Sequence, residues 1–130
     1  MPSKARQRTL DLQARALRFS AGVNSACPER FSHLPSETVW GQLVRAADSV
    51  SNNLIEADDA SSDADFVHKM RVVLREAKES RQCLVKLRLS RLSAFEKVAG
   101  LEREAGELSA IFATILMNVL KRLDRERARH

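Results

Sequence analysis

Residues 66–87 read FVHKMRVVLREAKESRQCLVKL, and the spacing of their apolar and small side chains decides the fold. One series alternates steps of four and three residues along this segment. Its members are Phe66, Met70, Val73, Ala77, Ser80, Leu84 and Leu87. On an α-helix such a series forms one continuous seam, of the kind with which helices pack in antiparallel bundles. The segment therefore predicts a long helix that buries one face against other helices.

Three other segments have apolar patterns of the same kind, which places helices at about 9–26, 36–57, 62–89 and 93–127. Prolines interrupt the pattern between the first two of these segments. No alternation typical of strands competes with the helices. The sequence therefore predicts one all-α domain over residues 1–130, an up-down-up-down antiparallel four-helix bundle.

Serines are expected to cap three of the helices, because a serine hydroxyl accepts a hydrogen bond from a free amide of the first turn. The expected caps are Ser36, Ser62 and Ser93. In the fourth helix the predicted seam consists of Val98, Glu102, Ala105, Ser109, Phe112, Leu116, Val119 and Leu123. A second apolar row follows Leu101, Leu108, Ile111 and Ile115. So wide an apolar face predicts that this helix is buried on two sides.

Composition excludes several classes of protein. With 44% hydrophobic and 30% charged residues, the chain is globular rather than disordered. It contains no apolar run long enough to cross a membrane, and its basic N-terminal segment lacks the apolar core of a signal peptide. A cytoplasmic protein without a membrane partner is expected. Cys27 and Cys83 have no partners at zinc-ligand spacing, which predicts two free thiols.

Catalytic patterns are poor. His33, His68 and His130 are widely separated, and no two of them share a metal-ligand spacing. There is no glycine-rich phosphate loop and no nucleophile elbow. Glu56 and His68 have the chemistry of an acid and base pair, but a structural histidine is the favoured interpretation. The sequence therefore predicts a protein that is not an enzyme and has no cofactor and no metal site.

The net charge of +5 is distributed unevenly. Residues 37–65 include one basic and seven acidic residues, whereas residues 66–91 include eight basic and two acidic ones. Basic side chains along a helix neutralise phosphates and release counterions, so RNA or DNA is a possible partner, contacted through its backbone. A solvated helix face is the alternative. The candidate nucleic-acid-binding residues are Arg15, Arg18, Arg71, Arg75, Lys78 and Arg88.

A stripe of polar residues crosses the apolar pattern of the second helix. Its members lie on one side of that helix: Gln42, Arg45, Ser49, Asn53 and Glu56. Arg45 and Glu56 are three turns apart and cannot pair within the helix, and a buried arginine needs its charge paired. We therefore expect the stripe to bond to another helix or another subunit, as a polar network or a subunit interface. A catalytic cluster is the less favoured interpretation.

Residues 42–87 resemble the core of the bacterial four-helix bundle family known from intervening sequences of the large-subunit ribosomal RNA gene. The matching residues are Gln42, Arg45, Ala46, Ala47, Ser49, Asn53, Glu56, Phe66, Ala77 and Ser80. Elsewhere the resemblance rests on the helix pattern. Many members carry aromatic residues early in the first helix and late in the third. This chain has Leu12 and Gln82-Cys83 there, so the packing is expected to differ.

The resemblance implies that the bundle assembles as a homopentameric ring. A ring of this kind is similar to the accessory protein of diversity-generating retroelements, which binds RNA and a reverse transcriptase through a basic exterior. Members of the ribosomal branch have no established biochemical activity. Together with the charge pattern, the resemblance indicates a homo-oligomeric accessory protein that binds RNA or serves as a scaffold. A purely structural oligomer that binds another protein is the alternative.

Overall fold

The structure is a computed structural model that describes the backbone of residues 1–130 and every side chain except that of Phe95. It consists of four helices: α1 (Lys4–Ala26), α2 (Leu34–Asp58), α3 (Asp63–Leu89) and α4 (Phe95–Ala128). The prediction of an all-α protein is confirmed, since the described backbone contains no strand. None of these helices is both long enough and apolar enough, over the described residues, to cross a membrane.

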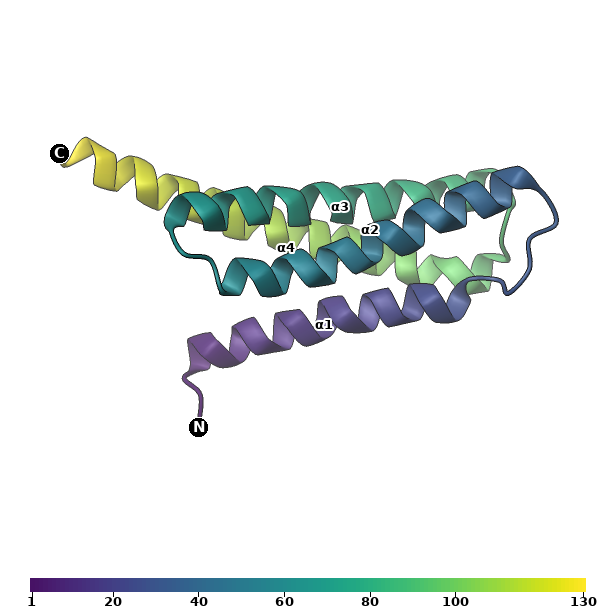
Figure 1. Cartoon of the computed structure of the whole chain (residues 1–130), viewed down its shortest axis with the longest axis horizontal. Helices are drawn as coiled ribbons and strands as arrows, with labels where there is room; N and C mark the ends of the chain where they lie inside the picture. Colours follow the sequence, from purple (N-terminus) through teal and green to yellow (C-terminus); the bar gives the residue numbers. More distant parts are fainter.

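Successive helices run in opposite directions, and each packs against the next (Figure 1). α1 also contacts α4, which closes the bundle, whereas α1 with α3 and α2 with α4 lie on its diagonals. The most extensive packing is between α2 and α3, and the least extensive is between α1 and α4. The predicted up-down-up-down bundle is therefore confirmed. Figure 1 also shows the last turns of α4 reaching beyond the turn that joins α2 to α3.

The N-termini of the helices can be compared with the caps that the sequence predicts. Ser62 caps α3 as expected, because its hydroxyl accepts a hydrogen bond from the amide of Asp65 at 3.1 Å. α1 begins about five residues before its predicted start, where the hydroxyl of Ser3 accepts from the amide of Arg6 at 3.0 Å. The short segment before Thr9 lacks the apolar repeat, so periodicity does not predict this part of the helix.

The other two predicted caps were wrong. α2 begins at Leu34, so Ser36 lies buried within its first turn and His33 occupies the cap position. Pro35 is tolerated there because the first amides of a helix have no partner inside the helix. At α4, Ala94 rather than Ser93 occupies the cap position, and no side chain bonds to the helix start.

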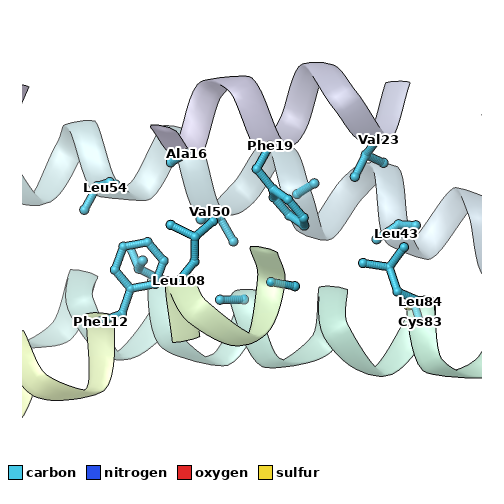
Figure 2. Packing of buried hydrophobic residues seen from close by; sticks show 14 of the residues in the cluster. Ala16, Phe19, Val23, Leu43, Val50, Leu54, Cys83, Leu84, Leu108 and Phe112 are labelled. Atoms are coloured by element: carbon cyan, nitrogen blue, oxygen red, sulfur yellow. The ribbon is translucent and has the colours of Figure 1, made fainter. Parts of the chain in front are cut away.

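One hydrophobic core runs along the bundle. Trp40 of α2 and Phe112 of α4 are its largest fully buried side chains. Figure 2 shows Phe19 of α1 and Val50 of α2 pointing into the same interior as Phe112. The core therefore joins helices that are far apart in the sequence as well as adjacent ones.

The seam predicted for α3 is confirmed, because its members from Met70 to Leu87 are at most 1% exposed. In α4 the predicted repeat is correct at Val98, Ala105, Phe112 and Leu116. Leu108 rather than Ser109 completes it, however, and the hydroxyl of Ser109 donates to the carbonyl of Ala105 at 2.8 Å. A straight helix has 3.6 residues per turn, so a strict seven-residue series drifts around a helix as long as α4.

Several buried residues of α2 and α3, the most extensively packed pair, are small. They are Ala46, Ala47, Ser51, Ala57, Ala77 and Ser80, and all are buried. The hydroxyl of Ser80 donates to the carbonyl of Glu76 at 2.8 Å, so its burial leaves no unpaired donor. Small side chains allow two helix backbones to approach closely, which accounts for the extent of this contact.

Gly22 and Gly100, both within helices, should respond differently to alanine. A Cβ at Gly100 would have no heavy atom within 4 Å, whereas a Cβ at Gly22 would lie 3.1 Å from Cδ2 of Leu101. We expect Gly100→Ala to raise the free energy of unfolding by about 0.5–1 kcal/mol, because alanine lowers the entropy of the unfolded chain. Gly22→Ala should gain less or lose stability, since Leu101 must move. Urea unfolding measures both, and equal gains would contradict the close contact.

Candidate nucleic-acid interface

The six residues predicted to bind nucleic acid do not form one surface. Arg15 and Arg18 lie on α1, whereas the other four lie on α3, the helix diagonal to it. Arg15 is engaged across the α1–α4 boundary, because its guanidinium donates to Glu104 at 2.8 and 2.6 Å and to Glu107 at 3.0 Å. Arg88 is engaged in the same way by Glu102, with two hydrogen bonds of 3.0 Å. These two arginines therefore hold helices together.

The remaining candidates are available to a ligand. Arg18, Arg71 and Lys78 have no carboxylate within 4.0 Å among the described side chains. Arg75 lies 3.9 Å from a carboxylate oxygen of Glu76 and is 70% exposed. Arg71, Arg75 and Lys78 are spaced four and three residues apart, so they share one outward side of α3. Arg18 lies apart from them on α1.

An arginine bridges each of the four pairs of neighbouring helices. Arg6 binds Asp58 between α1 and α2 at 2.7 Å, and Arg45 binds Glu79 between α2 and α3. Arg88 and Arg15 make the corresponding bridges from α3 to α4 and from α1 to α4. Hydrogen bonds from these arginines lower the pKa of each carboxylate that accepts them: Asp58, Glu79, Glu102 and Glu104.

Acid is expected to weaken all four helix pairs. The lowered pKa values keep these carboxylates ionised in the folded state at pH values where the unfolded chain is protonated. Their stabilisation is present above the ordinary pKa values of 3.8 for Asp and 4.5 for Glu, and is lost as the pH falls through the folded values. Glu76, whose pKa is raised by burial, acts in the opposite direction but is one group against four. We expect the urea midpoint to fall by roughly 1 M between about pH 7 and pH 3.

The control for this prediction is Arg15→Gln. Without the arginine, the pKa of Glu104 is no longer lowered by its largest cause, so the variant should show a smaller change of midpoint with pH. Circular dichroism in urea at the two pH values measures both proteins. A midpoint that is unchanged or higher in acid would show that the bridges do not stabilise the bundle.

Two cations that sequence reasoning missed line a groove between α3 and α4. Arg81 and Arg103 face a hollow of about 600 Å³, and Arg81 and Gly106 also face an adjoining hollow of about 320 Å³ beside Lys78. Neither arginine has a carboxylate within 4.0 Å among the described side chains. Arg81 comes three residues after Lys78, so extending the α3 spacing by one step would have found it. Arg103 is brought to the groove only by the fold.

Arg45, from the polar stripe of α2, bonds to another helix but is not buried. Its guanidinium donates to Glu76 at 3.3 Å and to Glu79, and its side chain is 55% exposed. The carboxylate of Glu76 beneath it is buried, and burial together with the neighbouring Glu79 raises its pKa. The expectation of a buried arginine was wrong, because α2 buries the next residue, Ala46, and leaves Arg45 at the edge of the helix contact.

The other members of the stripe make separate contacts. Glu56 accepts a hydrogen bond from Lys69 of α3 at 2.9 Å. Asn53 donates to the carbonyl and the hydroxyl of Ser49, one turn earlier, at 2.9 and 3.0 Å. The expectation that stripe members do not satisfy one another within the helix was therefore wrong for this pair. Gln42 is exposed. A role of the stripe at a subunit interface stays a prediction.

The second apolar row of α4 is only partly buried, because Leu108 is buried but Leu101, Ile111 and Ile115 are intermediate in exposure. Ile111 and Ile115 border a groove of about 520 Å³ between α1 and α4, together with Leu12. Arg8 and Arg18 of α1 stand at the edges of this groove. The first side of α4 is buried in the core as predicted, whereas this chain covers the second only in part.

Histidines and thiols show no catalytic arrangement. His33, His68 and His130 are exposed and lie in different parts of the chain, and Glu56 bonds to Lys69 rather than to His68. The described residues contain no group of three histidine, cysteine or acidic side chains that could hold a metal ion. Cys27 and Cys83 are free thiols as predicted, and burial raises the pKa of both.

Comparison with known proteins supports the resemblance read from residues 42–87. A family model described as 23S rRNA-intervening sequence protein matches residues 8–114. A crystal structure of a protein of unknown function from the S23 ribosomal protein family of Bacteroides thetaiotaomicron VPI-5482 is similar, with a TM-score of 0.72 at 21% identity. The likeness covers 84% of this chain and 97% of that one. At this identity it shows the fold alone. No curated protein sequence matches this chain.

Proposed function

We propose that this chain, which belongs to the family of 23S rRNA-intervening sequence proteins, is a non-enzymatic, cytoplasmic homo-oligomer that binds RNA through α3. The observation that carries the proposal is a set of exposed cations on this helix with little or no carboxylate pairing. We call this surface the α3 basic face, and it consists of Arg71, Arg75, Lys78 and Arg81.

The α3 basic face suits the sugar-phosphate backbone of RNA. Its side chains follow one side of the helix over about 15 Å, given a rise of 1.5 Å per residue. The two acidic residues of α3 beyond its first turn are used elsewhere, because Glu76 is buried and Glu79 binds Arg45. A polyanion on this face therefore meets positive charge that, among the described side chains, is compensated directly only at Arg75, 3.9 Å from Glu76, and it releases counterions when it binds. Such contacts favour weak sequence specificity.

The non-enzymatic part of the proposal is supported by the dispersal of the groups that usually carry catalysis. The histidines lie apart, and the family is described by a gene location rather than by a reaction. The α3 basic face consists of cations alone, which suits binding of an anion better than proton transfer.

The test of RNA binding is retention of a single-stranded RNA over a salt series, with duplex DNA as a second probe. If about four phosphates are contacted, affinity for the single strand should fall roughly 50-fold between about 50 and 200 mM salt. The variant Arg71→Gln/Arg75→Gln/Lys78→Gln removes three contacts and should bind about 100-fold more weakly near 0.1 M salt.

The matched control is Arg125→Gln/Arg127→Gln/Arg129→Gln, which removes the same charge from the exposed end of α4. Its affinity should stay close to that of the wild type. The proposal is wrong if no RNA is retained at low salt, if affinity does not depend on salt, or if both triple variants lose affinity equally.

The homo-oligomeric part is supported by apolar residues that face outward on α1 and α4. On α1 they alternate steps of four and three residues and are all exposed: Leu10, Ala14, Leu17 and Ala21. On α4, residues 108–120 include no charged residue, although Thr114 and Met117 are exposed. Apolar residues gathered on an outer face are typical of surfaces that pack against another chain. We propose that these two faces pack between copies, in the ring of five that the family resemblance implies.

Light scattering across a dilution series tests the assembly. A ring of five has a mass of about 73 kDa, five times the 14.6 kDa of the chain. Leu17 is 60% exposed on the proposed interface, so Leu17→Lys should lower the mass. Leu89 is 70% exposed at the end of α3, outside the interface, so Leu89→Lys should leave the mass unchanged. A monomeric wild type, or equal behaviour of both variants, would exclude this interface.

A second candidate function is an oligomer that binds an acidic protein. It is favoured by the groove between α1 and α4, which has an apolar floor of Leu12, Ile111 and Ile115 and is edged by arginines. An acidic amphipathic helix suits such a surface. Failure to retain RNA, together with an intact oligomer, would favour this candidate over the first.

A further inference from the structure

Resting on the proposed function, we infer that the groove between α3 and α4 binds the phosphates of an RNA strand. Lys78, Arg81 and Arg103 would be the residues that contact them. The groove consists of two adjoining hollows, of about 600 and 320 Å³, which share Arg81 and Gly106. We call it the α3–α4 groove. Within the α3 basic face, the inference assigns phosphate binding to Lys78 and Arg81. It adds Arg103 from α4.

The charged side chains that line the α3–α4 groove differ in whether they already form ion pairs within the protein. Arg88 and Glu102 also line it, but they neutralise each other through two hydrogen bonds of 3.0 Å. Glu107, at its other edge, accepts a hydrogen bond from Arg15 of α1. Lys78, Arg81 and Arg103 have no carboxylate within 4.0 Å among the described side chains. The groove therefore presents three cations whose charge is not neutralised by a direct ion pair.

Small residues on the α4 side of the groove leave room for the sugar-phosphate backbone of a strand to approach. These residues are Ala99, Gly106, Ser109 and Ala110. A side chain at position 106 would enter the groove, because a Cβ there would lie 3.5 Å from Nε of Arg81. The lining residues extend over about ten residues of each helix, or about 15 Å. A groove of this length spans a short run of consecutive phosphates.

The residue types fit phosphate from two directions. Arg81 stands on the α3 wall and Arg103 on the α4 wall, so a strand in the groove has a guanidinium on each side. Guanidinium groups donate two parallel hydrogen bonds to phosphate oxygens, whereas the ammonium of Lys78 contributes a point charge. The arrangement recognises a chain of phosphates rather than the bases attached to them.

The first experiment compares Arg81→Gln/Arg103→Gln with Arg125→Gln/Arg129→Gln, which removes the same charge at the end of α4. Each phosphate contact to a single strand contributes about 0.7 to the slope of log affinity against log salt. The groove variant should therefore bind about 25-fold more weakly near 0.1 M salt, with a slope less steep by about 1.4. The control should keep the slope of the wild type. Circular dichroism should show both variants folded, because none of the four residues makes an ion pair within 4.0 Å among the described side chains.

The second experiment places a carboxylate in the groove through Gly106→Glu. The new side chain lies beside Arg81 and should neutralise it, which should weaken RNA binding without removing a native group. The matched control is Gly41→Glu, the same change at an exposed position of α2 where a Cβ has no heavy atom within 4 Å and that does not line the groove. It should bind RNA nearly as the wild type does.

The outcomes separate this inference from the proposed function. If Arg71→Gln/Arg75→Gln/Lys78→Gln weakens binding but neither groove variant does, RNA binds the α3 basic face outside the groove and the inference is wrong. If the wild type retains no RNA at low salt, the proposed function itself fails. If Gly106→Glu and Gly41→Glu lose affinity equally, the effect is one of overall charge, which also contradicts the groove.

Discussion

Trp40→Ala is expected to lower the free energy of unfolding by about 3–5 kcal/mol, the usual cost of removing a large aromatic side chain from a core. Trp40 is fully buried and is the largest side chain in the interior. Its removal leaves a cavity that close-packed neighbours fill only in part. Because it is the only tryptophan, far-UV circular dichroism in urea is the suitable measurement. A loss below about 1 kcal/mol would mean that the core collapses freely around this position.

Trp40→Phe separates the size of the side chain from its polar atom. Nε1 of Trp40 has no hydrogen-bond partner among the described protein atoms, and an unpaired buried donor costs about 1–3 kcal/mol. Phenylalanine removes that donor while it fills most of the space. We therefore expect stability within about 1 kcal/mol of the wild type. A loss as large as that of the alanine variant would show that the indole nitrogen is paired in solution.

Ala77→Leu is the second change with a large expected effect. Ala77 is 1% exposed in the α3 seam, and α3 packs most extensively against α2, which carries buried small residues such as Ala46 and Ala47. A leucine has no space between helices packed this closely, so it must push α2 and α3 apart or adopt a strained rotamer. We expect a loss of about 2–3 kcal/mol in the free energy of unfolding.

The control for Ala77→Leu is Lys78→Leu, the same new side chain one position later on the exposed side of α3. Its stability should stay within about 0.5 kcal/mol of the wild type, as is usual for surface substitutions. Urea unfolding compares the two variants directly. If Ala77→Leu is no less stable than Lys78→Leu, the contact between α2 and α3 is looser than its small residues indicate.

Much of this fold follows from periodicity in the sequence. The α3 seam was predicted residue by residue because a helix with one buried face repeats its apolar residues at fixed steps. The ends of helices were less predictable. Ser36 and Ser93 have the chemistry of caps, but whether a serine caps a helix depends on where the chain turns, and composition alone does not specify this.

Less of the candidate site followed from the sequence. Linear spacing placed Arg71, Arg75 and Lys78 on one side of α3, and the structure agrees. It did not show that Arg15 and Arg88 are bound by glutamates of α4, because ion pairing between helices depends on their relative rotation. Arg103 was missed for the same reason. The availability of a charge is thus a property of the tertiary structure rather than of the charge pattern.

The order of the helices around the bundle also bears on how quickly the chain folds. Three of its four helix contacts join consecutive helices through short connections, and the one contact between distant segments, α1 with α4, is the least extensive. Folding can therefore proceed hairpin by hairpin, and little entropy is lost in closing long loops before the core forms. The same topology makes α1 the element that is easiest to detach in local unfolding, since it meets α4 through the smallest shared surface.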